Sequence, residues 1–263
     1  MGLSAVAVTW WGHSTLTVTD AGVRVLTDPV LGRRVAHLRR RRGVPPPPTV
    51  RDADVVVISH LHGDHLHLPS LAAIAPTVPV VVPRGAPSAV RGLRRLRGRE
   101  LVEVEPGDCV QVGAVSIRAV PALHDGRRWP AGRRRVPALG YVIEGRGRTY
   151  FAGDTDLYRD MATQVGRCDV ALLPVGGWGP GLGPGHLDPH RAAEALALLG
   201  ARVAVPVHFG TLWPIGLDRV RPDEFFLPGR RFTEVAGQLA SAAAVRELAP
   251  GQTARFEPPE LVD

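Results

Sequence analysis

Residues 54–65 read Asp-Val-Val-Val-Ile-Ser-His-Leu-His-Gly-Asp-His, an apolar run that ends in three histidines and an aspartate. The apolar part has the length and the β-branched composition of a buried strand. A single histidine at such a strand end is usually a hydrogen-bonded core residue. Three imidazoles and a carboxylate together would lose hydration there without gaining anything from packing, and a bound cation removes that cost. The stretch therefore predicts a metal site.

Good metal ligands also follow three later apolar runs. These ligands, each with the run that it follows, are His124 after 115–120, Asp154 after 149–152 and His208 after 203–207. Loops at strand ends can build a site on a rigid scaffold, and all of these segments can converge on one edge of the sheets. The sequence thus predicts one metal site assembled from segments that lie far apart in the chain.

Strand-like and helix-like segments follow one another along the chain. The β-like runs are 5–11, 14–19, 23–27, 54–58, 79–83, 101–104, 110–112, 115–120, 140–144, 148–152, 170–174 and 203–207. The helical patterns are 69–75, 87–97, 157–165, 189–199 and 231–244. No internal repeat or break in composition divides the chain. We therefore expect residues 1–263 to form one α/β domain of layered sheets.

The composition is that of a globular chain with a sizeable core. It has 263 residues, 44% of them hydrophobic, and it lacks the roughly 18 uninterrupted apolar residues that a membrane span needs. The N-terminal stretch has no basic region of a signal peptide and reads as a strand. Cys109 and Cys168 lie far apart, which indicates neither a disulfide nor a cysteine metal site. We expect a cytoplasmic protein without a membrane span.

The basic residues are all arginines, 32 in number, and the net charge is +7. Many of them cluster in Gly- and Pro-rich stretches, which places them on loops: 33–34, 39–42, 94–95, 127–128 and 133–135. One interpretation is an ordinary solvated surface. The other is a field that attracts a small anionic or phosphate-bearing substrate. Nucleic acid is a possible partner that the sequence does not favour.

The chain resembles the metallo-β-lactamase superfamily, whose signature His-x-His-x-Asp-His is matched by His60, His62, Asp64 and His65. The resemblance implies a four-layer αββα sandwich that holds two metal ions. It implies one ion bound by His60, His62 and His124, and another bound by Asp64, His65 and His208. Asp154 would bridge the two ions.

Within the superfamily the chain looks most like the N-acyl-phosphatidylethanolamine-hydrolysing phospholipase D branch, with the ascorbate-6-phosphate lactonase group as a relative. The motifs that carry this similarity are Trp11-Gly-His-Ser-Thr15, Leu26-Thr-Asp-Pro29, Ile58 to Leu66, Ala152-Gly-Asp-Thr155, His186-Leu-Asp-Pro189 and His208-Phe-Gly-Thr211. The chain departs from the branch at Leu61, Gly63 and His190-Arg191. It also lacks a convincing amphipathic membrane-binding helix, so a membrane phospholipid does not follow from the similarity.

The residue types suggest hydrolysis. Imidazole nitrogens and carboxylate oxygens without thiolate suit Zn²⁺, with Mn²⁺ or Fe²⁺ as alternatives. Two divalent cations about 3.5–4 Å apart can share a hydroxide, lower its pKa and polarise the carbonyl or phosphoryl oxygen that it attacks. No serine or cysteine nucleophile is needed. We expect a dinuclear metal-dependent hydrolase that acts on a phosphodiester or another anionic ester or lactone, with catalytic roles for Asp64, Asp154 and His186.

Three polar residues stand beside the predicted ligands. Asp28 is either a turn aspartate or an acceptor that orients a ligating histidine. His13 either satisfies a turn or lies near the site. His186 follows a flexible Gly-Pro-Gly and either belongs to a loop or lies beside the metals, where it could stabilise the transition state. The remaining histidines read as surface residues: His37, His67 and His190.

Two other classes of function remain open from the sequence. A nucleic-acid-processing hydrolase of the same superfamily would use the same metals and the arginines, although the substrate-clamping arm of the tRNA-processing branch is not evident. A non-catalytic regulatory protein with a vestigial metal site would be expected to have lost ligands. All seven predicted ligands are present in this chain.

Overall fold

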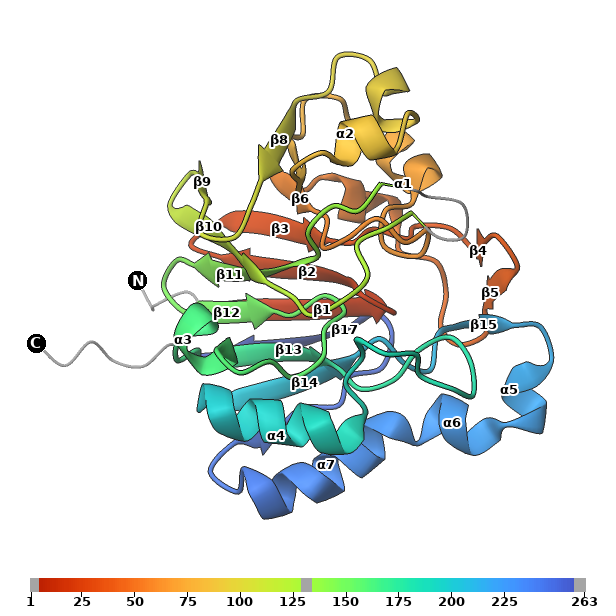
Figure 1. Cartoon of the computed structure of the whole chain (residues 1–263), viewed down its shortest axis with the longest axis vertical. Coiled ribbons are helices and arrows are strands. Elements are labelled where there is room, and N and C mark those ends of the chain that lie inside the picture. The colour runs from red at the N-terminus through yellow and green to blue at the C-terminus, as the bar shows by residue number, and fades with distance from the viewer. Residues whose placement is uncertain (1–4, 129–133, 258–263) are drawn as a thin grey trace, which may run out of the picture.

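Two seven-stranded sheets face each other in the computed structural model, which describes residues 5–128 and 134–257 (Figure 1). The strand order of the first sheet is β17-β1-β2-β3-β6-β7-β8. Its strands are β1 (Val6–Gly12), β2 (Thr15–Asp20), β3 (Val23–Thr27), β6 (Val55–Val57), β7 (Val80–Pro83), β8 (Leu101–Val104) and β17 (Gln252–Phe256).

The second sheet has the order β16-β14-β13-β12-β11-β10-β9. Its strands are β9 (Cys109–Val112), β10 (Val115–Pro121), β11 (Leu139–Glu144), β12 (Arg148–Phe151), β13 (Val170–Pro174), β14 (Val203–Val207) and β16 (Ala244–Val245). A small third sheet has the order β15-β5-β4, formed by β4 (Arg34–Val35), β5 (Leu38–Arg40) and β15 (Leu212–Pro214).

Helices cover the outer faces of the two large sheets, so that the layers run α, β, β, α (Figure 1). On the first sheet they are α1 (Leu68–Ala72), α2 (Ala86–Ala89) and the short 3₁₀ helices η1 (Pro48–Arg51) and η2 (Leu93–Arg95). On the second they are α3 (Met161–Val165), α4 (Pro189–Leu199) and α7 (Pro228–Leu239), with α5 (Leu217–Val220) and α6 (Pro222–Phe226) beside the small sheet. The predicted αββα sandwich is confirmed.

The side chains of β6 show how the sequence builds these layers. Val55 and Val57 point into the large cluster between the two sheets, whereas Val56 points into the cluster under α1 and α2. Successive side chains of a strand point to opposite faces, so a strand buried on both faces must be apolar throughout. The Val-Val-Val run at 55–57 is apolar throughout because both faces of β6 are buried.

Parallel pairing fixes where the strands end. Strands β3, β6, β7 and β8 pair in parallel, and so do β12, β13, β14 and β16 in the second sheet. Because the carboxyl ends of parallel strands lie at the same edge, the loops that follow β3, β6, β12 and β14 meet at one edge of the sandwich. The loops after β6, β12 and β14 carry six of the seven predicted ligands, the loop after β3 carries Asp28, and His124 follows β10.

The predicted strands are all present within one or two residues of their expected bounds, whereas of the five helix predictions only 189–199 has the observed bounds. The helices expected at 69–75 and 157–165 are shorter, at Leu68–Ala72 and Met161–Val165. The pattern 87–97 is not one helix but α2 and η2, because the backbone becomes extended at Val90, with φ of −121° and ψ of 91°. The helix expected at 231–244 begins at Pro228 and ends at Leu239. In the described parts of the chain, no helix has the length and apolar character required to cross a bilayer.

Candidate metal centre

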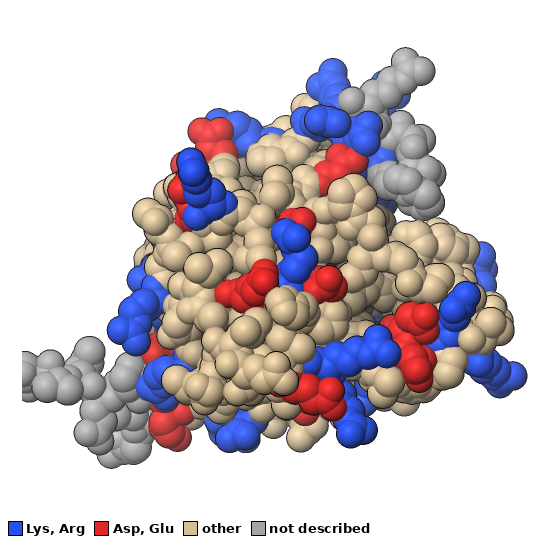
Figure 2. Space-filling view, turned by 60° about the horizontal axis from the view of Figure 1, so that its bottom comes forward, with Lys and Arg blue, Asp and Glu red and all other residues tan. Residues whose placement is uncertain are grey.

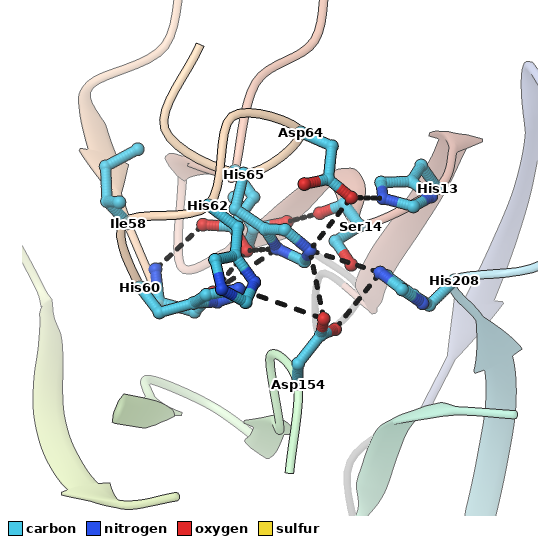
Figure 3. Close-up of polar contacts among 12 residues, drawn as sticks. His13, Ser14, Ile58, His60, His62, Asp64, His65, Asp154 and His208 are labelled. Atoms are coloured by element: carbon cyan, nitrogen blue, oxygen red, sulfur yellow. Dashed lines mark hydrogen bonds and ion pairs between the residues drawn. The ribbon is translucent and has the colours of Figure 1, made fainter. Parts of the chain in front are cut away.

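The seven predicted ligands lie together at the shared edge of the sheets. Figure 3 labels six of them, all except His124. The turn after β6 carries four of them, and the loops after β10, β12 and β14 carry one each: His60, His62, Asp64, His65, then His124, Asp154 and His208. Both large sheets therefore contribute side chains to the same place. Their nitrogen and oxygen atoms fall into two neighbouring groups.

The first of these, the His60 group, consists of His60, His62, His124 and Asp154. One ligand atom from each side chain lies within 4.8 Å of those from the others. His62 Nδ1 is 3.2 Å from His124 Nε2, and His60 Nε2 is 3.8 Å from Asp154 Oδ2. Three nitrogens and one carboxylate oxygen at this spacing can surround a divalent cation.

The second, the His65 group, consists of Asp64, His65, His208 and also His13. His65 Nε2 lies 3.1 Å from His208 Nε2 and 3.7 Å from Asp64 Oδ2. His13 Nε2 is 2.8 Å from Asp64 Oδ2. Asp154 lies between the two groups, since its Oδ2 is 3.2 Å from His65 Nε2 and its Oδ1 is 3.2 Å from His208 Nε2.

The hydrogen bonds of the ring nitrogens decide which atoms carry protons. His208 Nδ1 donates to Gly176 O over 2.8 Å, and His124 Nδ1 donates to Gly185 O over 2.7 Å. A carbonyl can only accept, so in a neutral ring the Nε2 atom presents a lone pair. His65 Nδ1 likewise faces the Asp28 carboxylate at 2.7 Å. Several lone pairs consequently converge, and a cation is the partner that satisfies them together.

Two buried atoms of the centre have no hydrogen-bond partner among the described residues, namely His60 Nε2 and Asp154 Oδ1. A buried polar atom without a partner costs free energy and calls for an explanation such as an ion. Both atoms belong to side chains that point into the middle of the centre in Figure 3. The residues present thus fit divalent metal ions.

Burial favours the neutral form of three imidazoles of the centre, those of His60, His62 and His208. It lowers the pKa of His60 and of His208 well below the ordinary value, and neighbouring imidazoles lower it further. Burial and the nearby His124 together lower the pKa of His62 to about 4. Neutral imidazole is the form that binds a metal, so these rings are held ready as ligands.

Carboxylates concentrate negative charge around His65. Burial opposes the ionisation of Asp154, but the imidazoles of His208 and His65 outweigh it and hold the pKa of this carboxyl well below its usual range. Burial likewise opposes a charge on His65, yet the carboxylates of Asp154, Asp64 and Asp28 raise its pKa well above the ordinary value. A positive charge is therefore favoured at His65 Nε2, and a bound cation would supply it.

Asp28 follows β3 and lies behind His65. Its Oδ1 accepts from the Ser59 backbone amide over 2.8 Å, and its Oδ2 accepts from the Ser59 hydroxyl and from His65 Nδ1. The backbone of Asp28 has φ of +35°, a conformation that costs energy for a residue with a side chain and is concentrated at functional sites. The contacts of Asp28 are those of an acceptor that orients His65.

His13 lies closer to the centre than the sequence indicated, because it belongs to the His65 group itself. Its carbonyl accepts from the indole of Trp10 over 2.8 Å and from the backbone amide of His208 over 3.1 Å. The rings of His13 and His208 lie 4.0 Å apart between centroids. Both residues have positive φ, at +55° and +63°. The two loops that carry them therefore fix each other.

A cavity of about 510 Å³ opens onto both groups. The glycine-rich loop at 177–184 forms one wall, with Trp178 and Leu182 as its large side chains. His186 reaches into the cavity: its Nδ1 donates to Gly183 O over 3.0 Å, and its Nε2 is 3.5 Å from Asp154 Oδ2. His186 is thus beside the candidate metal groups, but it belongs to neither of them.

Among the described residues that line this cavity there is no arginine. Arg127 forms an ion pair with Asp125, which does line the cavity, with Nη2 2.7 Å from Oδ2. Figure 2 shows blue and red side chains interspersed on the face drawn there, without a continuous basic area. Among the described residues, the clustered arginines therefore do not form the wall of the cavity; several are exposed, whereas Arg40 is buried and Arg128 is half-buried.

Some residues of the centre carried no usable signal in the sequence. Ser59, which anchors Asp28, looks like any serine at a strand end. Arg128, which contacts the turn after β6, could not be distinguished from the other arginines. His67 was expected at the surface, but it is half-buried, with its Nδ1 2.7 Å from Ser70 Oγ. His37 and His190 are exposed as expected.

Comparison with known proteins places this chain among relatives. Over 223 residues it is 33% identical to a protein of Mycobacterium tuberculosis, covering 79% of this chain but only 59% of that one. It is 32% identical to a UPF0173 metal-dependent hydrolase of Methanopyrus kandleri, covering 83% and 89%. It is 29% identical to N-acyl-phosphatidylethanolamine-hydrolyzing phospholipase D 1 of Caenorhabditis elegans, covering 81% and 66%. The chain thus spans about three fifths of the mycobacterial relative.

Similarity of fold extends to solved structures. The metallo hydrolase Igni18 of Ignicoccus hospitalis superposes with a TM-score of 0.70 at 24% identity, covering 97% of this chain and all of that one. The family model of the beta-lactamase superfamily domain matches residues 23–209, a span that includes all seven candidate ligands. The chain belongs to the metallo-β-lactamase superfamily.

Proposed function

We propose that this protein is a dinuclear metal-dependent hydrolase whose substrate is a phosphodiester or another ester or lactone. The observation that carries the proposal is the pair of donor groups that share Asp154 and open onto one cavity. The names of relatives support it, since they include metal-dependent hydrolases and a phospholipase D. Because both sheets supply donors, we infer that residues 1–263 act as one hydrolase domain.

Each residue of the centre has a separate role in the proposed hydrolase. The His60 group and the His65 group would each hold one ion, with Asp154 as the ligand common to both. The donors suit Zn²⁺, with Mn²⁺ or Fe²⁺ as alternatives. When bound, a pair of divalent ions supplies a nucleophilic hydroxide near neutral pH and polarises the oxygen of the group under attack. Asp28 holds His65 in the orientation that binding requires, and His186 faces the substrate from the cavity wall.

The cavity limits the charge of the substrate. Its described lining offers imidazoles, glycines and the apolar side chains of Trp178 and Leu182, without an arginine to pair with a phosphate. A phosphodiester carries one negative charge, which the metal pair itself can balance. A phosphomonoester carries up to two, and the second would be left without a cationic partner. We therefore infer a diester, or an ester or lactone with apolar substituents, in preference to a monoester.

Metal analysis followed by a panel of substrates tests the proposed function. We expect about two transition-metal ions per chain, and hydrolysis of a phosphodiester or a lactone that exceeds hydrolysis of a phosphomonoester with the same leaving group. A β-lactam and an RNA oligonucleotide complete the panel. A protein that binds no metal would contradict the dinuclear centre, and a preference for the monoester would contradict the inferred substrate charge.

Replacing Asp28 with asparagine should weaken metal binding by about 10–100-fold, the usual effect of losing a partner behind a metal ligand. The amide would place N–H groups where the carboxylate now accepts from Ser59 and His65. Competition with a chromophoric chelator measures the affinity. Asp20→Asn is the matched control, because Asp20 is buried at the other end of β2 and accepts only from the backbone amides of Arg146 and Gly147. Equal affinity in wild type and Asp28→Asn would contradict the role of Asp28.

A further inference from the structure

Arg128 contacts the turn that carries most of the candidate ligands. It follows His124 by four residues, and its guanidinium reaches back to the turn after β6. Its Nη1 donates to Leu61 O and to Leu66 O over 2.7 Å each, and it lies 3.4 Å from His62 O. These three carbonyls bracket the turn from its first residue to its last. One side chain therefore spans the segment that holds His62, Asp64 and His65.

The contacts of Arg128 differ from those of Arg127. Arg127 is exposed and forms an ion pair with Asp125. Arg128 is half-buried, and no carboxylate of the described residues lies within ion-pair distance of its guanidinium. Burial lowers its pKa, while the charge of Asp64 raises it. Partial burial of a guanidinium costs free energy, and the hydrogen bonds of Arg128 to the carbonyls of the turn offset that cost.

The segment that carries Arg128 is itself held firmly. A Cβ at Gly126 would lie 1.8 Å from the carbonyl oxygen of Val136, so the backbone packs there without space for a side chain. His124 is fixed by its hydrogen bond to Gly185. Arg128 therefore joins two ligand-bearing segments, the turn after β6 and the loop after β10, at a defined distance.

We propose that Arg128 is a positioning residue that sets the separation of His62 and His124, and with it the affinity of the His60 group for its metal ion. This inference rests on the proposed metal binding. The His60 group takes donors from both segments that Arg128 joins. The His65 group takes none from the loop at 124–128. Loss of the guanidinium should consequently weaken one ion much more than the other.

Two variants and a neighbouring control test this proposal. Arg128→Ala removes the side chain, and Arg128→Met keeps most of its bulk while removing every donor. Arg127→Ala removes the adjacent arginine, which does not contact the turn. Stepwise Zn²⁺ titration against a chromophoric chelator measures the two affinities separately, without any need for a substrate. Circular dichroism reports whether each variant is folded.

We expect both Arg128 variants to bind one ion nearly as wild type does and the other about 10–100-fold more weakly. Guanidinium at millimolar concentration should restore the weak site in Arg128→Ala, where it can occupy the space left by the side chain, but not in Arg128→Met. Arg127→Ala should bind both ions as wild type does.

Several results would overturn the proposal. Unchanged affinities in Arg128→Met would show that the hydrogen bonds to the turn are dispensable. An equal loss of both ions without rescue by guanidinium, or an unfolded Arg128→Met, would make Arg128 a general structural residue. A wild-type protein that binds no metal would instead contradict the proposed function, so the two failures are distinguishable.

Discussion

An Asp154→Ala variant is expected to lose both metal sites together and to lower kcat/KM by more than about 100-fold, which is the upper end of what loss of a partner behind a ligand costs. The oxygens of Asp154 approach nitrogens of both groups, with 3.2 Å to His65 and 3.2 Å to His208, and 3.8 Å to His60. Its removal also leaves several lone pairs facing one another without the carboxylate. Metal content after dialysis and steady-state kinetics measure the effect.

Asp156→Ala is the control for this variant. Asp156 lies two residues further along the same loop, but it accepts from Arg191 over 2.7 Å and does not line the cavity of the metal centre. It should retain both metals. If Asp154→Ala kept full metal occupancy and activity, Asp154 would not bridge the two groups. If it lost one ion and kept the other at wild-type affinity, Asp154 would be a ligand of a single site.

Changing His186 to alanine should lower kcat by roughly 10²-fold or more while leaving metal content unchanged and KM little altered. His186 lines the cavity with Nδ1 bonded to Gly183 O, and so its Nε2 faces the site. From there it can donate a hydrogen bond to the oxygen on which charge develops, or protonate the leaving group. Either contact is made in the transition state, which is why kcat should respond more than KM.

The outcomes for His186→Ala are distinct. Loss of metal would make His186 a ligand, and a raised KM alone would make it a substrate-binding residue. Unchanged kinetics on the true substrate would assign it to the loop only. His190→Ala is the matched control, since His190 is exposed on α4 and contacts only Glu194, at 3.3 Å.

The strands of the fold were predictable because their apolar runs are short, β-branched and bounded by turns, as in Val55–Val57. The helices were less predictable than the strands. The pattern favoured a single helix at 87–97, but the backbone becomes extended at Val90 and the segment divides into two short helices. The small sheet of β4, β5 and β15 was not predicted, because strands of two or three residues are too short to show a periodicity.

The candidate ligands were predictable from their positions after strands, and the structure brings them together. The parts played by His13, Ser59 and Arg128 were not, because each depends on contacts with residues distant in the chain. The sequence allowed two interpretations of His13, a turn residue or a residue near the site. Its contacts with Asp64 and His208 decide for the second. Tertiary contacts determine which histidine, serine or arginine takes part in the centre, and these contacts cannot be read from a single sequence.

The arrangement of the centre has a consequence for how the protein is made. The loop at His13 and the loop at His208 are hydrogen-bonded to each other although they lie near opposite ends of the chain. During synthesis a nascent chain holds the turn at 60–65 long before the ribosome has released residue 208. The early histidines then lack the partners that confer tight, geometrically selective binding. The proposed metal centre therefore has all of its donors only once residue 208 has been translated, and it can be loaded with metal only at that late stage.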